Sequence, residues 1–262
     1  MVRLFSGHYD TPTFFTMSSL CESAAAAVEL LVGLDPMLWT IVGRSLWVST
    51  LSTSLACVAG IVLGAWLGVA RFAGRDAVLT LLNTLLALPS VVVGLVVYLL
   101  LSRSGPLGYL GWLFSLKAMV LAQAALVLPV VTALTRQLVE DAEQGHGEQL
   151  RSLGARTVMR SVLLAWDERY ALLTVVIAAF GRAVSEVGAV MVVGGNIDGF
   201  TRVMTTAIAL ETSKGDLPLA LALGLVLMLV VLCLNMLISG LRRWRQRMDG
   251  LSNEPASFLS AA

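Results

Sequence analysis

The sequence predicts an all-α polytopic membrane protein with five transmembrane helices, preceded by an interfacial N-terminal helix. Of the 262 residues, 57% are hydrophobic and only 13% are charged, whereas about a quarter are charged in an ordinary soluble domain. The apolar residues also gather in four long blocks without any charge, at 45–70, 77–102, 118–135 and 217–241. This composition excludes a conventional soluble enzyme, and it excludes intrinsic disorder, which needs low hydrophobicity and high charge.

Each uncharged block is long enough for one crossing, because about 20 apolar residues span a hydrocarbon core about 30 Å thick. A fifth segment, Tyr170 to Ile197, is interrupted only by Arg182 and Glu186. Spanning segments must be helices or closed barrels, and uniformly apolar runs lack the alternation of a barrel. We therefore expect a transmembrane domain over 38–247, with spans at about 45–70, 77–101, 117–136, 171–195 and 217–241.

The two ends of the chain are expected to lie outside the spans. Residues 1–37 read as an extracytoplasmic or interfacial segment, and an interfacial helix through Leu30 to Leu46 fits this part better than a signal peptide, which needs positive charge before its apolar stretch. Met17 is an alternative start to Met1. Residues 248–262 are expected to form a cytoplasmic tail.

The distribution of arginine predicts the orientation in a bacterial cytoplasmic membrane, since cytoplasmic loops carry an excess of Lys and Arg. One side collects Arg71, Arg75, Arg136, Arg151, Arg156, Arg160, Arg169, Arg242, Arg243, Arg245 and Arg247. The other side has only Arg3, Arg44, Arg103, Lys117, Arg202 and Lys214. The connector 137–170 and the C-terminus are therefore expected inside, and five spans then put the N-terminus outside.

Glycines and prolines within the spans predict how the helices pack. Gly60, Gly64 and Gly68 recur every four residues on one face of the first span, a spacing typical of close contact between membrane helices. Pro89 and Pro129 lie in or near the ends of the second and third spans. Both are expected to kink their helices, which suits either packing or gating.

Arg182 and Glu186 are the exceptional charges of the fourth span. Their spacing of four residues places them on one helix face, so we expect them to pair. Arg182 lies roughly 18 Å beyond the interface at Tyr170, since a helix rises about 1.5 Å per residue. Intramembrane charges usually face the protein interior or an aqueous cavity. The pair therefore reads either as an internal salt bridge that fixes packing or as a charge near the mouth of a pathway.

The polar connector 137–170 is too long for a simple turn. Residues 148–155 read as a short helix that ends at Gly154, where glycine adopts a left-handed cap, and a helical pattern resumes from Arg156. This helix–glycine–helix elbow reads either as a docking knob or as a solvated loop.

The sequence shows no pattern typical of a metal site or of an ATP-binding P-loop. Three cysteines without a C-x-x-C pair and two distant histidines predict no metal site and no disulfide framework. A P-loop needs Gly-Lys followed by Ser or Thr, but Lys117 follows Leu116 and Lys214 follows Ser213. The chain therefore does not bind ATP by this motif.

Glu148 followed by Gly154 in such a connector resembles the EAA loop of ABC-importer permeases. The triplet here is Glu148-Gln149-Leu150 in place of Glu-Ala-Ala, and no proline follows before Pro218. A second stretch, Phe180 to Ile197, resembles the fourth core helix of molybdate/sulfate/tungstate-type permeases. Three further stretches look like the tungstate branch of that group: Leu88–Tyr98, Ser102–Gly108 and Thr201–Asp216.

The resemblance, which covers roughly Leu38 to Trp244, implies the type I ABC importer permease fold and a transport subunit rather than an enzyme. It implies a homodimer that forms the path for a tetrahedral oxyanion, tungstate first, with molybdate or sulfate as alternatives. It also implies two ABC ATPase subunits that use ATP and Mg, an extracytoplasmic oxyanion-binding protein, no cofactor on this chain and no nucleic acid.

The resemblance assigns two sets of residues. Coupling to the ATPase would fall to Glu148, Gln149, Leu150, Arg151, Ser152, Leu153, Gly154 and Ala155. The translocation path or gate would include Arg182, Ser185, Glu186, Gly194, Gly195, Asn196, Thr205 and Thr206.

Two other classes compete with this interpretation. An ATP-independent channel or secondary transporter predicts inverted repeats or several intramembrane carboxylates, and an intramembrane protease needs a nucleophile–base pair at membrane depth. The predicted spans contain no histidine and a single carboxylate, Glu186, which disfavours both.

Overall fold

The computed structural model describes residues 25, 28–29, 32–33 and 35–252, and every regular element within them is a helix. In chain order these are α2 (Pro36–Val69), α3 (Arg75–Ala87), α4 (Ser90–Leu101), the 3₁₀ turn η1 (Gly108–Leu110), α5 (Leu116–Ser152), α6 (Thr157–Asp167), α7 (Arg169–Val184), α8 (Gly188–Gly194), α9 (Met204–Lys214) and α10 (Leu217–Ser252). The predicted all-helical class is confirmed.

Among the described residues, three helices are long and apolar enough to cross a membrane unaided: α2, α5 and the 217–241 part of α10. Two further segments pass the same test only as bent pairs, α3 with α4 at 102° and α7 with α8 at 57°. Counting each pair as one span gives up to five, the number expected. The second and fourth spans are nevertheless broken rather than continuous.

The break between α3 and α4 has a local cause. Leu88 adopts an extended backbone (φ −66°, ψ 133°) and Pro89 follows as the N-cap of α4, because a proline disfavours helical geometry in the residue before it. Pro129 behaves differently, since it lies buried inside α5 and the helix continues through it.

The first helix begins earlier than its apolar block. Asp35 caps it, with Oδ1 accepting hydrogen bonds from the Met37 and Leu38 amides at 2.9 Å, and Pro36 occupies the first helical position, where its missing N–H costs nothing. Residues 36–46 are therefore the first turns of α2, and the separate interfacial helix expected up to Leu46 is not formed there. Most of its upstream part lies outside the described residues.

The glycine stripe of α2 packs against α5, as predicted. A Cβ at Gly60 would lie 2.9 Å from Val131 Cβ, and one at Gly64 would lie 2.5 Å from the Thr132 carbonyl oxygen. Neither distance leaves room for a side chain. The glycines thus allow the close backbone approach that van der Waals packing between membrane helices requires.

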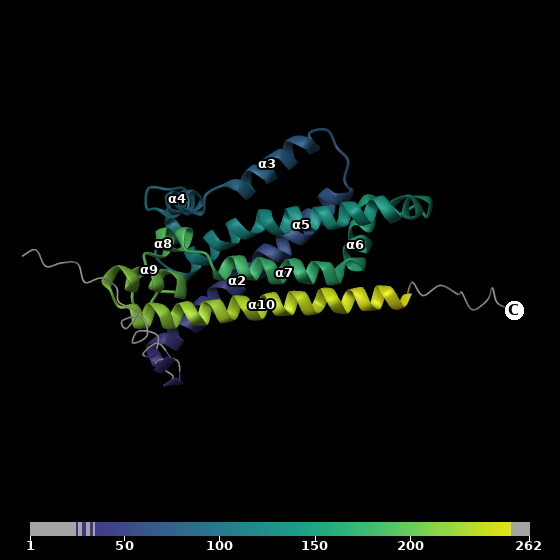
Figure 1. The fold of residues 1–262 in the computed structure, drawn as a ribbon. Coiled ribbons are helices and arrows are strands. Elements are labelled where there is room, and N and C mark those ends of the chain that lie inside the picture. Colours follow the sequence, from purple (N-terminus) through teal and green to yellow (C-terminus); the bar gives the residue numbers. More distant parts are fainter. Residues whose placement is uncertain (1–24, 26–27, 30–31, 34, 253–262) are drawn as a thin grey trace, which may run out of the picture.

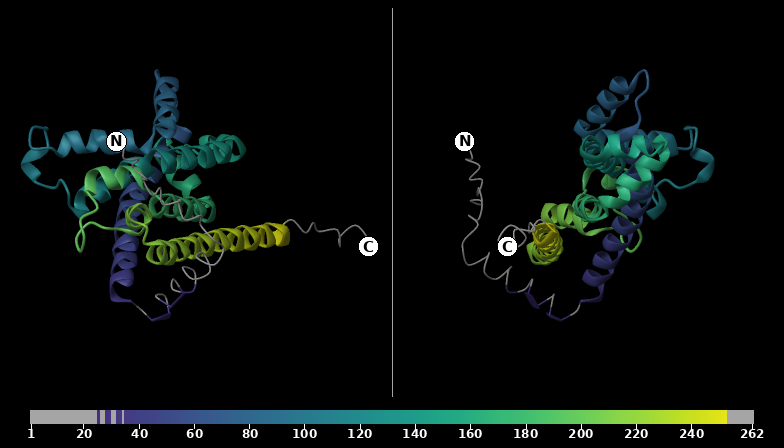
Figure 2. Two further views of the ribbon diagram at one scale, coloured as in Figure 1. Left: turned by 60° about the vertical axis from the view of Figure 1, so that its left-hand side comes forward. Right: turned by 90° about the vertical axis from the view of Figure 1, so that its right-hand side faces the viewer.

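Helix α5 carries the core of the bundle. Its buried face contributes to three apolar clusters, which it shares with α2, α4, α6, α7 and α8. Figure 1 shows α5, α7 and α10 running side by side with α2 crossing them, and Figure 2 shows α3 at the outer edge. We call the end where α5 passes into α6 the elbow end, and the end with residues 195–217 the loop end. The last described turns of α10 lie at the elbow end (Figure 1).

Candidate functional site

The elbow is the sharp turn between α5 and α6. Helix α5 ends at Ser152, and Gly154 adopts the left-handed conformation (φ +78°) that lets its amide bond the Arg151 carbonyl at 2.9 Å. Leu153 at the tip is 81% exposed. The helix–glycine–helix turn expected from the sequence is present. The expected short helix at 148–155 is corrected, because Glu148 to Ser152 are the last turns of the long α5.

A buried carboxylate closes the elbow. Glu143 of α5 is only 6% exposed, and its Oε1 lies 2.8 Å from Arg151 Nη2 and 2.7 Å from Arg160 Nη1 of α6. Gly147 lies over this carboxylate, since a Cβ there would be 2.7 Å from Glu143 Cδ. Glu143 is not among the residues expected from the sequence. The only available signal was its place on the same helix face as Gly147 and Arg151.

A second carboxylate ties the α2–α3 connector to α5 near the elbow end. Glu140 pairs with Arg136 on its own helix, with Arg75 at 2.9 Å and with the more exposed Arg71 at 3.5 Å. The Arg136–Glu140 pair has the four-residue spacing of an ion pair within one helix. The other two depend on how α2 packs against α5.

The break between α7 and α8 removes the expected pair in the fourth span. Arg182 and Glu186 form no ion pair, although both lie in the described part of the chain. Helix α7 ends at Val184, so a spacing of four residues no longer equals one helical turn there. Glu186 Oε1 instead accepts from the Ala189 amide at 3.2 Å, at the start of α8. The exposed Ser185 donates back to the Gly181 carbonyl at 2.9 Å.

The remaining expected path residues lie near the loop end, with their hydroxyls turned to the backbone. Thr205 Oγ1 donates to the Glu186 carbonyl at 2.8 Å, which places Thr205 directly against the α7–α8 break. Thr206 caps α9 through Val203, and Asn196 Nδ2 donates to the Thr206 carbonyl at 3.3 Å. The structure thus brings Glu186 together with Thr205, and Asn196 with Thr206.

Gly194 and Gly195 end α8. Gly194 is buried against Met119 of α5, and Gly195 adopts φ +67° beside Phe114. Both fix the turn from α8 into the loop-end segment rather than lining open space.

The second halves of the two broken spans pack directly on each other. A Cβ at Gly94 of α4 would lie 2.7 Å from Ala189 Cα of α8, and one at Gly188 would lie 2.8 Å from Ser90 Oγ. Helices interrupted at membrane depth are a common way to form substrate paths in transporters. The α3–α4 and α7–α8 breaks therefore make the surface around this contact the candidate path region.

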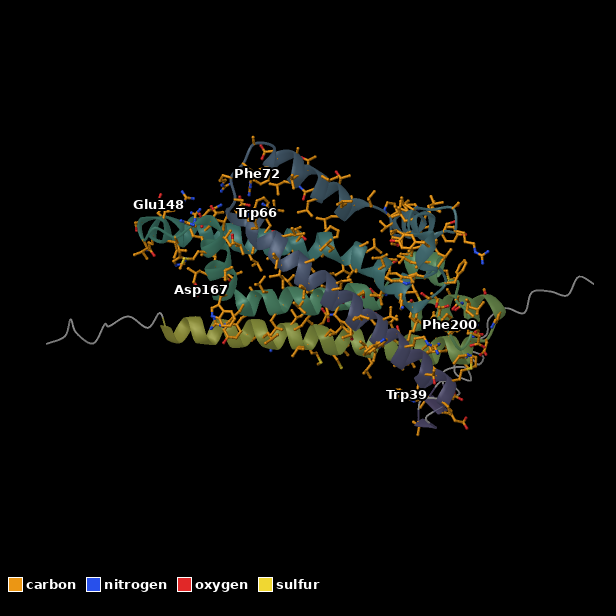
Figure 3. The ribbon with its side chains drawn as sticks, turned by 180° about the vertical axis from the view of Figure 1, so that it is seen from behind. Trp39, Trp66, Phe72, Glu148, Asp167 and Phe200 are labelled. Carbon is orange, nitrogen blue, oxygen red and sulfur yellow. The ribbon has the colours of Figure 1, made fainter. Side chains whose placement is uncertain are left out.

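The loop end carries its own charge network. Arg202 lies 3.1 Å from Asp198 and 3.8 Å from the buried Glu211, which Lys214 also contacts at 3.0 Å. Arg44 of α2 donates to the Gly199 carbonyl at 2.7 Å. This network fastens residues 198–203 to α2 and α9. Glu148 and Asp167 mark the elbow end in Figure 3, while Phe200 and Trp39 mark the loop end.

Apolar spanning helices, two broken spans and an exposed elbow together define a membrane transport subunit. Residues 60–247 match the family of binding-protein-dependent transport system inner membrane components, and the chain belongs to this family. Its members are permease subunits of ABC transporters with the type I fold: multi-pass inner membrane proteins that are not themselves enzymes.

Individual relatives agree with this assignment. The chain is similar to the tungstate uptake system permease protein TupB of Peptoclostridium acidaminophilum, at 42% identity over 86% of this chain and 99% of that protein. The TupB of Campylobacter jejuni is 40% identical over 83% and 91%, and a probable anion ABC transporter permease of Haloferax volcanii is 39% identical over 80% and 92%. Permeases named for sulfate or molybdenum transport match at lower identity.

Proposed function

We propose that this chain is the permease subunit of an ATP-driven importer for a tetrahedral oxyanion, with tungstate as the transported anion. The names of the relatives that match almost end to end support tungstate. Those named for sulfate or molybdenum transport match less well, which makes molybdate and sulfate the alternatives that a transport assay must separate.

The observation that carries the proposal is the clamped elbow. Its tip exposes Leu153, while Glu143 and Arg160 hold the turn rigid from within. A rigid, exposed elbow suits docking into a groove of an ATPase subunit, which would hydrolyse ATP and transmit its closure to α5. Since α5 runs without a break from the elbow to Leu116, a movement at the elbow reaches the path region directly.

Charge supports placing the elbow end in the cytoplasm. The elbow end collects Arg71, Arg75, Arg136, Arg151 and Arg160, and the arginine-rich 242–247 segment lies there as well. Positively charged loops stay in the cytoplasm. The loop end would then face the outside, where a binding protein delivers the anion.

A second copy of the chain would complete the path. Helices α4 and α8 are in direct contact through Gly94 and Ala189, which leaves no room for an anion between them. The path therefore lies on their outer face and needs a second wall. A homodimer supplies it, and α3, whose one buried residue is Leu82, offers a further surface for the partner.

Transport requires binding weak enough to release the anion. Arg182 and the Ser185 hydroxyl are exposed beside the α7–α8 break and are suited to a transient contact with an oxyanion. Thr205, Thr206 and Asn196 would act on the shape of the path, since their side chains donate hydrogen bonds to backbone carbonyls.

The test is uptake of labelled tungstate by cells that carry or lack this chain, with excess unlabelled tungstate, molybdate or sulfate as competitor. Uptake that depends on the chain and is displaced best by tungstate is expected. Displacement best by molybdate or sulfate would reassign the anion within the same class. Equal uptake in both cells would reject an importer of these anions.

A further inference from the structure

Gln123 is a buried polar residue that joins three helices of the bundle. It lies on α5 with 4% of its surface exposed. Its Oε1 accepts a hydrogen bond from Ser52 Oγ of α2 at 2.9 Å, and its Nε2 donates to the Ala183 carbonyl of α7 at 2.9 Å. One amide therefore connects three helices.

The acceptor at Ala183 is a carbonyl at the end of a helix. The last carbonyls of any helix lack a partner within it, and an unpartnered polar group in an apolar setting costs free energy. The surroundings here are apolar, since Ala183 belongs to the same buried cluster as Val127 and Ala179. The Ala183 carbonyl also accepts from the Glu186 amide at 3.2 Å, so the amide of Gln123 is its second donor and ties α5 to the last turn of α7, where that helix stops.

The same break is held from its other side by α9. Thr205 Oγ1 donates to the Glu186 carbonyl at 2.8 Å, three residues beyond Ala183. Gln123 and Thr205 therefore bracket the segment 184–186, where the chain bends by 57°. Gln123 also lines one small crevice together with Arg182 and Glu186.

We propose that Gln123 is a positioning residue that fixes the α7–α8 break and so holds Arg182, Ser185 and Glu186 in the geometry used during transport. This inference rests on the proposed function, because it assigns the break to the anion path. Gln123 acts through the Ala183 carbonyl and does not itself contact the anion.

The first test replaces Gln123 by Met, which has similar length and no hydrogen-bond donor. The chain is reconstituted in proteoliposomes with its ATPase subunits and binding protein. We expect Gln123→Met to lower the maximal rate of tungstate uptake about tenfold, with the KM for loaded binding protein unchanged, because that protein docks at the loop end. Ser52→Ala removes only the α2 contact and should stay within about twofold of wild type.

A readout independent of transport follows the break itself. A cysteine is introduced by Ser185→Cys into a chain whose three native cysteines have been replaced, and its reaction with a water-soluble thiol reagent is timed. Gln123→Met should change the labelling rate severalfold, whereas Ser52→Ala should not. This measurement needs no transported anion.

The second test uses Gln123→Glu, whose side chain donates to the Ala183 carbonyl only when it is protonated. Uptake by this variant, relative to wild type at each pH, should rise as the pH falls from 8 to 6. The titratable or charged groups around this site are Arg182, Glu186 and, in the adjoining cluster, Cys57. All three groups are also present in wild type, so any effect of their titration on uptake drops out when the uptake of the variant is divided by that of wild type at the same pH. Because both pH values are measured on one preparation of the variant, a difference between them does not come from a different amount of folded protein.

The inference is overturned if Gln123→Met keeps wild-type uptake and labelling, or if the relative uptake of Gln123→Glu does not rise as the pH falls. Failure of the proposed function looks different, because wild type itself would then transport none of the three anions. The thiol labelling would still report whether Gln123 holds the break.

Discussion

Glu143 Oε1 on α5 lies 2.7 Å from Arg160 Nη1 on α6, and this buried ion pair joins the two arms of the elbow across Gly154. Breaking a buried pair by removing one partner typically costs about 3–5 kcal/mol, and loss of Arg160 would leave the buried Glu143 only the half-exposed Arg151 of its own helix as a counterion. A rigid elbow passes a movement of the ATPase on to α5, whereas a flexible elbow does not. The Glu143–Arg160 pair is therefore expected to be needed for coupling ATP hydrolysis to transport.

Arg160→Ala is therefore expected to uncouple the transporter. Uptake by reconstituted complexes should fall at least tenfold while ATP hydrolysis continues, since docking of the exposed tip does not require Arg160 itself. The matched control is Arg71→Ala, which removes a half-exposed arginine from Glu140 and should cost less than twofold. Equal ratios of uptake to hydrolysis in both variants would contradict the assignment.

Gly154 tests the shape of the elbow by conformation alone. Its φ of +78° suits glycine, and nothing lies within 4 Å of a Cβ added there, so a substitution strains the backbone without a clash. Gly154→Val should raise the ATP consumed per anion severalfold, because a β-branched residue resists the left-handed region. Gly154→Asn, which tolerates that region, should stay near wild type. If Val and Asn behave alike, the left-handed turn is not what coupling requires.

Glu148 tests whether the elbow docks through charge. It is exposed on the last turns of α5, so Glu148→Arg is expected to leave folding intact and to weaken co-purification of the ATPase subunits. Glu148→Gln should give an intermediate loss. Wild-type uptake and full co-purification in the charge-reversed variant would exclude Glu148 from the docking surface.

Gly64 and Gly43 form a matched pair on one helix. Both change from Gly to Ala within α2, but a Cβ at Gly64 would lie 2.5 Å from the Thr132 carbonyl oxygen, whereas a Cβ at Gly43 meets nothing within 4 Å. Gly64→Ala should lower the thermal unfolding midpoint in detergent by about 5 °C, since overpacking typically costs about 1–3 kcal/mol. Gly43→Ala should leave it unchanged or raise it slightly. Equal midpoints would refute the close α2–α5 contact.

Several features of the fold were predictable without the structure. The uncharged blocks predicted the spanning segments, the spacing of Gly60, Gly64 and Gly68 predicted the face that packs closely, and Gly154 predicted the turn of the elbow. Each of these depends on residues near one another in the chain, where composition and helical periodicity act directly.

The partners of the polar side chains were not predictable in this way. Arg182 and Glu186 have the spacing of an ion pair but do not form one, because α7 ends between them. Glu143 and Gln123 gave no strong signal, although one clamps the elbow and the other bridges three helices.

The length and number of apolar runs follow from the free-energy cost of placing charge in lipid, and this cost applies to each segment separately, whatever the rest of the chain does. The sequence by itself therefore determined that this chain is a helical membrane protein with a polar connector that turns at Gly154. A buried polar group must instead find a partner wherever the helices happen to bring one. Only the tertiary structure decided that the Ala183 carbonyl meets Gln123 and that Glu143 meets Arg160, because those contacts exist only once α2, α5, α6 and α7 have packed.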